Sequence, residues 1–261
     1  MTNVANKRFM TLLAVAALAV VTAGCANTGA NRQNASADAQ IYDPFENVNR
    51  SVLSVNESID KAVIEPVARG YRYVAPKPVR NSVRNVLRNL KSPVIMGNKL
   101  LQGDLEGFAN ASGRLFINTL IGVGGIFDVA DQGGIPYEPE DFGQTLAVWG
   151  VGHGPYIVLP LLGPSSARDG TGMVVDSLLD PVRIYMFSHD LEWLHYTRVG
   201  VGAIDQREEL LDVIDDLRRN SFDYYAALRS AYYQRRQALV NNLDPDMAAG
   251  PDIPDYGNGS N

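Results

Sequence analysis

Three histidines and one acidic cluster are the residues whose chemistry first suggests catalysis. His153, His189 and His195 are the only histidines in the chain, and their spacing matches neither an HExxH motif nor another metal-ligand pattern. Two of the acids Glu138, Glu140 and Asp141 could serve as an acid pair for glycoside chemistry. They also immediately precede a helix expected to begin near residue 142, where acids favour the helix dipole. That structural role accounts for them, and we predict no metal site.

Glycine pairs raise the question of a phosphate-binding loop. Gly122-x-Gly124 and Gly150-x-Gly152 begin like a dinucleotide-binding fingerprint, but Phe127 and Pro155 occupy the positions where a third glycine belongs. The sequence contains no GxxxxGK[ST] loop and no GxSxG nucleophile elbow. We therefore predict that the protein is not an enzyme and uses no dissociable cofactor.

The single cysteine, Cys25, has the clearest chemistry. Lys7 and Arg8 precede an apolar run over residues 9–22, which is too short and too rich in small residues to cross a membrane. The small residues Ala23 and Gly24 then stand directly before Cys25. This segment resembles a bacterial lipoprotein signal, in which the cysteine is acylated and becomes the first mature residue. The alternative is an ordinary secretory signal with a chance cysteine.

The lipoprotein interpretation divides the chain into four parts. Residues 1–24 are the signal peptide, and residues 25–40 are a small, polar and flexible tether after the lipidated Cys25. A cysteine carrying two or more acyl chains, palmitate among them, anchors a protein stably in a membrane. Ala26 directs such a lipoprotein to the outer membrane under the enterobacterial sorting rule. Residues 41–240 form the folded domain, and residues 241–261 are expected to be a disordered tail.

Composition limits what the domain can be. The chain has 261 residues, of which 46% are hydrophobic and 20% charged, as in ordinary globular proteins. One cysteine excludes an intrachain disulfide. The formal net charge of −6 argues against a general nucleic-acid binder, because such proteins need a basic face.

The apolar periodicity of the domain is helical, so we predict a mainly α fold. Apolar residues recur every three or four positions from Val79 to Leu90, and Arg80, Arg84 and Arg88 form a basic stripe on the opposite face. Like charges at this spacing repel, so the stripe requires either anionic head groups or acids from elsewhere in the fold. Further helices are predicted over residues 205–219 and 222–239, the last with Ser221 as N-cap.

Two stretches lack charge. Residues 115–127 are apolar and interrupted by glycines, and residues 142–167 contain no Asp, Glu, Lys or Arg. Several glycines and prolines in the second stretch exclude a simple spanning helix, since Pro costs about 3 kcal/mol in a helix interior. Such backbone lies either at membrane depth where protein buries it, or in the core of a soluble domain.

At this point the motifs, in order, resemble the MlaA/VacJ family of outer-membrane lipoproteins. The matching blocks, over about residues 43–240, are Asp43-Pro44-Phe45-Glu46, Asn49-Arg50, Asn98-x-Leu100-Leu101-Gln102-Gly103, Arg114-x-Phe116-x-Asn118-Thr119, Gly122-x-Gly124-Gly125-x-Phe127-Asp128-x-Ala130, Asp141-Phe142-Gly143-Gln144-Thr145-Leu146, Gly150-Val151-Gly152-x-Gly154-Pro155-Tyr156 and Gly163-Pro164-Ser165-x-x-Arg168-Asp169. Leu53 and Val55 depart from the aromatic residues expected there.

The resemblance implies a ring-shaped helical protein set in the periplasmic leaflet of the outer membrane of a diderm bacterium. It implies a glycine-rich hairpin, a central polar channel, and a position beside a trimeric porin. Members take mislocalised phospholipid from the outer leaflet and pass it to a soluble periplasmic carrier, MlaC. This intermembrane transport maintains the lipid asymmetry of the outer membrane.

The candidate site residues follow from this resemblance. Gly122, Gly124, Gly125 and Phe127 correspond to the hairpin that influences the channel. Arg114, Asn118 and Arg168 are candidates for contact with phospholipid, and the stripe of Arg80, Arg84 and Arg88 is a candidate to face head groups. For Arg114 and Arg168 the alternative is a structural ion pair, with Asp128 or Asp169 as the acid.

Two other functions compete with phospholipid transport. A structural lipoprotein could associate with porins and stiffen the envelope without moving lipid. An envelope hydrolase would need a catalytic constellation, which the sequence does not contain. Direction of transport and head-group preference do not follow from the sequence.

Overall fold

A computed structural model describes residues 41–243. The chain divides into two units, residues 1–43 and residues 44–261, and every described helix and strand belongs to the second unit. The expected signal peptide, Cys25 and the tether lie outside the described residues, as does the tail from residue 244 onward.

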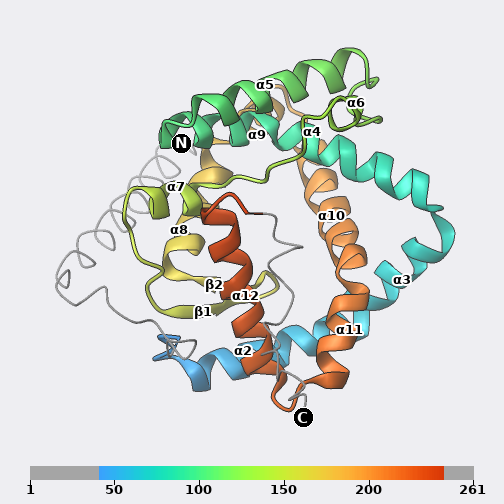
Figure 1. Ribbon diagram of the computed structural model, residues 1–261. Coiled ribbons are helices and arrows are strands. Elements are labelled where there is room, and N and C mark those ends of the chain that lie inside the picture. The colour runs from blue at the N-terminus through green and yellow to red at the C-terminus, as the bar shows by residue number, and fades with distance from the viewer. Residues whose placement is uncertain (1–40, 244–261) are drawn as a thin grey trace, which may run out of the picture. The chain divides into compact units, whose positions relative to one another are not determined.

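The second unit is mainly α-helical, as predicted (Figure 1). Its elements are α2 (Glu46–Ile59), the π-helix η1 (Asp60–Ile64), α3 (Glu65–Val74), α4 (Lys77–Gln102), α5 (Leu105–Leu120), α6 (Val129–Gln132), α7 (Phe142–Val148), β1 (Tyr156–Leu159), β2 (Gly163–Ser166), α8 (Ala167–Leu179), α9 (Pro181–Ser188), α10 (Glu192–Glu209), α11 (Leu211–Asn220) and α12 (Tyr224–Val240).

The helix predicted from Val79 to Leu90 is the first half of α4. Pro78 stands in its first turn, where the missing N–H of proline costs no hydrogen bond. Gly103 ends α4 in the left-handed conformation, at φ 77°. The side chain of Asp104 then accepts a hydrogen bond from the N–H of Gly107 and caps α5, which packs back along α4.

The charge-free run over residues 142–167 forms no spanning helix. It contains the short helix α7, a loop, and the antiparallel hairpin of β1 and β2, in which Tyr156 pairs with Ser166 and Leu159 with Gly163. Asp141 caps α7 by accepting from the N–H of Gln144 at 3.0 Å, the structural role expected for acids at this point. Within residues 41–243 no helix is both long and apolar enough to cross a membrane.

Two predicted helix boundaries near the C-terminus are wrong. The helix expected over residues 205–219 is broken at Leu210, which is both the C-cap of α10 and the N-cap of α11. The break redirects the chain so that Leu211 is fully buried, a change that a continuous apolar periodicity does not reveal. The N-cap of α12 is Asp223, whose carboxylate accepts from the N–H groups of Tyr225 and Ala226, and not Ser221.

The helices pack in a closed circuit. The helix α2 contacts β1, β2 contacts α12, α12 contacts α7, and α7 contacts α4. The helix α4 contacts α10, which packs on α3, and η1 leads from α3 back to α2. Figure 1 shows α12 beside the two strands and α10 beside α3 and α4.

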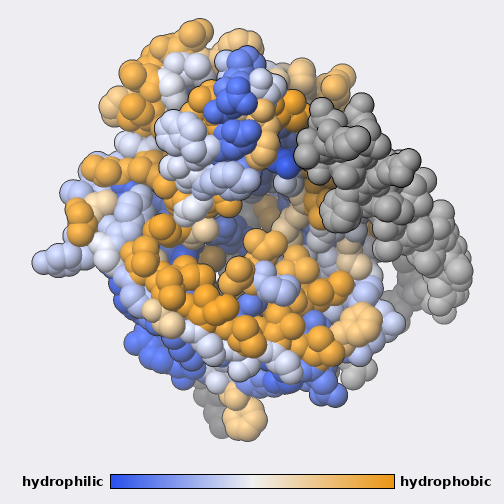
Figure 2. Space-filling view, turned by 180° about the vertical axis from the view of Figure 1, so that it is seen from behind, coloured by the Kyte–Doolittle hydropathy of each residue, from blue (hydrophilic) through white to orange (hydrophobic). Residues whose placement is uncertain are grey.

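Burial of polar and apolar residues is inverted relative to a soluble protein. Among residues 41–243, ten hydrophobic residues are buried, whereas eighteen polar or charged residues are buried and 38 large hydrophobic residues are exposed. Figure 2 shows the exposed apolar side chains as broad patches on the face seen from behind. Exposed apolar area of this extent is typical of a surface that contacts lipid or protein rather than water.

Candidate functional site

The glycine-rich segment after α5 forms a compact turn over residues 121–127. Val123, Gly124 and Gly125 have positive φ angles of 55°, 70° and 93°. The N–H of Phe127 donates to the carbonyl oxygen of Gly122 at 3.0 Å and closes the turn. A Cβ atom on Gly122 would lie 2.3 Å from the backbone carbonyl oxygen of Phe127, so only glycine fits there.

Two asparagines of α4 hold the glycine turn and the end of α5. The Asn85 amide donates to the carbonyl oxygen of Ile126 at 3.3 Å, and the Asn89 amide donates to Thr119 Oγ1 at 3.0 Å. A Cβ atom on Gly125 would lie 2.7 Å from the Cβ of Asn89, so the absence of a side chain permits close approach of the turn to α4. By contrast, a Cβ on Gly124 would meet nothing within 4 Å.

Arg114 and Asn118 hold the base of the glycine turn through one carboxylate. Arg114 Nη2 lies 2.6 Å from Asp128 Oδ2, and the amide of Asn118 donates to Asp128 Oδ1 at 2.9 Å. Burial opposes ionisation of Asp128, but the hydrogen bonds from Arg114 and Asn118 outweigh it and keep the pKa of Asp128 below its usual value. The ion pair with Asp128 is the structural alternative that the sequence left open for Arg114.

A cleft of about 420 Å³ is lined by α4, the glycine turn and α6, beside the point where the turn approaches α4. One wall is polar and the other is partly apolar. The lining residues are Pro78, Asn81, Ser82, Arg84, Asn85, Arg88, Ile126, Phe127, Asp128, Asp131 and Gln132. Its volume lies within the range of small-molecule sites, roughly 300–1,000 Å³. It brings together three of the predicted residues, Arg84, Arg88 and Phe127.

The basic stripe on α4 faces acids of α10, which is the second of its two expected environments. Arg80 pairs with Glu208, and Arg84 reaches Asp205 at 3.1 Å and Glu208 at 3.2 Å. Both acids are almost fully buried. Arg88 differs, because the acid with which it pairs, Glu209, is exposed and lies 3.8 Å away.

Arg168 belongs to a different cluster. It lies in the first turn of α8, is buried, and its Nε donates to Asp169 at 2.9 Å. Asp169 also pairs with Arg236 of α12, and its pKa is lowered because this arginine and Tyr232 outweigh the effect of burial. Arg168 thus forms the ion pair expected as its alternative role, and it does not line the cleft beside the glycine turn.

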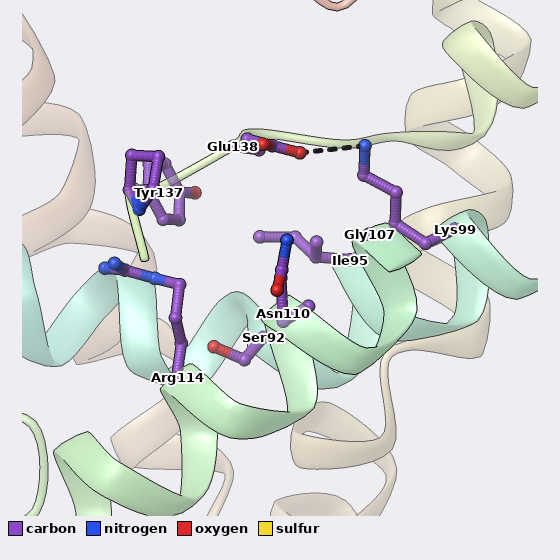
Figure 3. A pocket seen from close by; sticks show the side chains of 10 residues that line it. Ser92, Ile95, Lys99, Gly107, Asn110, Arg114, Tyr137 and Glu138 are labelled. Atoms are coloured by element: carbon purple, nitrogen blue, oxygen red, sulfur yellow. Dashed lines mark ion pairs between the residues drawn. The ribbon is translucent and has the colours of Figure 1, made fainter. Parts of the chain in front are cut away.

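A smaller pocket between α4 and α5 is almost filled. Its volume is about 10 Å³, room for one water molecule. Figure 3 shows Arg114 directed toward Tyr137 on one side of this pocket and Lys99 directed toward Glu138 on the other. Lys99 is buried and lies 3.0–3.1 Å from Asp104, Glu138 and Glu140. This cage holds the loop before α7 against α4 and leaves no space for a ligand.

Sequence reasoning missed the Lys99 cage and the join between α2 and β1. The side chain of Asn49 donates to the carbonyl oxygen of Tyr156 and accepts from the N–H of Val158. The side chain of Asn56 likewise donates to the carbonyl oxygen of Leu159 and accepts from the N–H of Leu161. The spacing of seven residues, which puts both asparagines on one face of a helix, was the available signal. Within residues 41–243 no group of three or more His, Cys, Asp or Glu side chains could hold a metal.

Comparison with known proteins gives consistent matches. A family model described as "MlaA lipoprotein" matches residues 41–239. The chain is 38% identical over 242 residues to the "Intermembrane phospholipid transport system lipoprotein MlaA" of Shigella flexneri, covering 88% of this chain and 89% of the relative. It is 37% identical to the Escherichia coli (strain K12) protein of the same name, with the same coverage. An uncharacterised protein of Rickettsia felis is 36% identical over 210 residues, or 80% of this chain and 82% of the relative.

One solved structure is also similar. It is described as "Structural basis for maintenance of bacterial outer membrane lipid asymmetry" and aligns with a TM-score of 0.67 and 36% sequence identity. The alignment covers 76% of this chain and 99% of the solved chain.

Proposed function

The chain belongs to the MlaA lipoprotein family, and we propose that it carries mislocalised phospholipid out of the outer leaflet of the outer membrane. It acts in intermembrane phospholipid transport, the system for which its relatives are named, and so maintains lipid asymmetry. Its family is one of lipid-transport lipoproteins rather than known enzymes. Transport of this kind needs no covalent step and no cofactor beyond the lipid on Cys25.

The inverted burial pattern is the observation that carries this function. A phospholipid head group resists passage through hydrocarbon, as does a single charged side chain, which costs roughly 2.5–3.5 kcal/mol at the centre of a membrane helix. A protein with apolar outer walls and polar groups inside lowers this barrier. The 38 exposed large hydrophobic residues and the buried polar network of residues 41–243 fit this requirement.

The closed circuit of helix contacts supports a ring with a polar channel. In this proposal the exposed apolar residues lie in the periplasmic leaflet, and the glycine turn stands at the channel. Cys25 carries the acyl chains, and the polar residues 26–40 connect them to the folded domain. The chain works with other components of a transport system, for which we propose a trimeric porin and a soluble MlaC-like carrier as direct partners.

The first experiment measures phospholipid exposed on the cell surface. Intact cells of a wild-type strain, a deletion strain and a Cys25→Ala strain are treated with added phospholipase, and the released products are quantified. We expect more product from both mutant strains, because transport is lost in one and the anchor in the other. Unchanged exposure in the deletion strain would refute the proposed transport function.

A second variant separates transport from the porin-associated structural role. Gly124→Trp places a large side chain at the glycine turn, where a Cβ atom would meet nothing within 4 Å, and in this proposal the ring obstructs the channel. We expect surface-exposed phospholipid to rise while the amount of protein and its co-purification with porin stay unchanged. If exposure stays at the wild-type level with normal amounts of protein, the structural role is favoured.

A further inference from the structure

The cleft between α4 and the glycine turn contains one arginine that differs from the others of the basic stripe. Arg84 is 18% exposed in its side chain and has three acids within 3.5 Å. Arg88 is 36% exposed, and its acid partner Glu209 is both exposed and 3.8 Å away. An exposed pair at this distance contributes little, typically 0–1 kcal/mol, so Arg88 can exchange Glu209 for an anionic ligand at small cost.

The guanidinium of Arg88 is also held in position. Its Cζ lies 4.7 Å from the centroid of the Tyr137 ring. Stacking on an aromatic face fixes the plane of a guanidinium and leaves its N–H groups, which lie in that plane, available to donate. A planar fork of N–H donors suits two oxygens of one phosphate group.

The other polar groups of the cleft complement a zwitterion. Asn81 and Gln132 are exposed and can donate hydrogen bonds from their amides. Of the two acids, Asp128 is neutralised by Arg114, so it does not strongly repel an anion. Asp131 is exposed on α6 and forms no salt bridge within residues 41–243, which leaves one carboxylate to receive a cation.

The remaining wall of the cleft is apolar. Ile126 and Phe127 of the glycine turn line it and are 38% and 56% exposed. Exposed apolar residues continue along the turn and the end of α5, at Phe116, Leu120 and Ile121. The cleft therefore has a polar side on α4 and α6 and an apolar side on the glycine turn, the same polarity as a phospholipid.

We propose that this cleft binds the zwitterionic head group of a glycerophospholipid, with its phosphate on Arg88, its ammonium on Asp131 and the first part of its acyl chains against Ile126 and Phe127. This site deepens the proposed transport function and rests on it. It assigns the role of head-group contact to Arg88 alone among the three arginines of the basic stripe.

Calorimetric titration of the full-length lipidated protein, held in amphipol, tests the site. The ligands are a short-chain, monomeric phosphatidylethanolamine, the corresponding phosphatidylglycerol, the corresponding diacylglycerol without phosphate, and inorganic phosphate. We expect phosphatidylethanolamine to bind best, and Arg88→Gln to weaken its binding about tenfold, the loss expected for a charge-assisted hydrogen bond. Arg88→Lys keeps the charge without the planar guanidinium, and its affinity for phosphatidylethanolamine should fall about threefold.

Two further variants complete the design. Asp131→Asn should weaken the binding of phosphatidylethanolamine but not that of phosphatidylglycerol, because only phosphatidylethanolamine presents an ammonium group. Arg219→Gln is the matched control, since Arg219 is exposed on α11 and its Nε donates to a backbone carbonyl of its own helix. It should bind every ligand as the wild type does.

The proposal is overturned if Arg88→Gln binds phosphatidylethanolamine as tightly as Arg219→Gln does. It is also overturned if diacylglycerol or inorganic phosphate binds the wild type as well as phosphatidylethanolamine, or if the wild type does not prefer phosphatidylethanolamine to phosphatidylglycerol. Normal binding by Arg88→Gln together with increased surface phospholipid in the deletion strain would remove this site and leave the transport function intact.

Discussion

At the scale of single residues, the glycines of the turn are required for different reasons. A methyl group on Gly122 would collide with the backbone oxygens of Phe127 and Asn118 at 2.3 and 2.5 Å, which cannot move without opening the turn. A methyl group on Gly124 would contact no neighbouring atom, so the substitution costs only the backbone strain of a positive φ angle. The two positions therefore separate steric exclusion from backbone strain.

We predict that Gly122→Ala destabilises the protein much more than Gly124→Ala, for which the left-handed conformation costs about 1 kcal/mol. Thermal unfolding midpoints of the purified variants measure the difference. Gly124→Asn serves as a control, because asparagine tolerates the left-handed conformation and should cost less than alanine. If the alanine variants at positions 122 and 124 lowered the unfolding midpoint equally, the predicted collision at Gly122 would be contradicted.

The lowered pKa of Asp141 predicts that stability depends on pH. Burial alone would raise its pKa, but hydrogen bonds from Arg236 at 2.6 and 3.0 Å lower the pKa to about 2, from an ordinary 3.8. A lowered folded-state pKa means that the ionised carboxylate stabilises the fold. This contribution is complete above the ordinary pKa and is lost as the pH falls toward 2.

Asp141→Asn should accordingly lower the free energy of unfolding near pH 7 by about 2 kcal/mol. Asparagine can still cap α7, so the loss reports mainly on the ion pair. Denaturant titrations between pH 7 and pH 2 should show the gap between variant and wild type closing at the acid end. Asp216→Asn, at an exposed position on α11, is the control and should show no such gap. A gap that is independent of pH would argue against the ion pair as its cause.

At the scale of elements, the contact between α2 and β1 completes the circuit of helices. Asn49 is buried and supplies both a donor and an acceptor to the outer edge of β1, as a neighbouring strand would. Asn56 repeats this arrangement two helical turns later, nearer to solvent. An edge strand without partners leaves unpaired peptide groups, and these two amides satisfy them from a helix.

We predict that Asn49→Leu costs about 3 kcal/mol, because it leaves one buried carbonyl and one buried N–H without partners. Asn56→Leu should cost less, since the N–H of Leu161 can bind water instead. Urea unfolding gives the free energies, and hydrogen exchange at Val158 locates the effect. Undiminished protection of the Val158 amide in Asn49→Leu would show that the asparagine is not what joins α2 to β1.

At the scale of the whole molecule, the exposed apolar surface predicts contact with lipid. Trp149 and Trp193 are the only tryptophans in the chain, and their side chains are 53% and 62% exposed. Trp149 directly follows α7 and Trp193 lies in the first turn of α10, so the two side chains sample separate parts of the surface. Each can report on its own surroundings in a variant that lacks the other.

We predict that bilayers containing brominated phospholipid quench the fluorescence of both Trp149→Phe and Trp193→Phe proteins, compared with bilayers of the unbrominated lipid. Bromine quenches only on close approach, so quenching places the remaining tryptophan in the hydrocarbon. A water-soluble quencher such as iodide should have little effect in the same samples. Strong quenching by iodide, with none by bromine, would assign these surfaces to water or to a protein partner.

The sequence by itself determined the local features of this protein. Periodicity predicted the first half of α4, and the acids before residue 142 predicted a helix N-terminus. The alternative role considered for Arg114, an ion pair with Asp128 or Asp169, is the one that forms, with Asp128 as the acid. Each depends on groups fewer than about twenty residues apart, whose geometry the backbone nearly fixes. The ordered motifs also identified the family, because they extend over most of the chain.

Only the tertiary structure decided which distant groups meet. The acids that neutralise Arg80 and Arg84 come from α10, more than 120 residues away, and the cage around Lys99 joins two loops to α4. The helix breaks at Leu210, next to the fully buried Leu211, and Asp223 rather than Ser221 caps α12. Many acids in the sequence were equivalent partners for these cations, and the choice among them is made by packing, because a buried charge is stable only where the fold supplies its counter-charge.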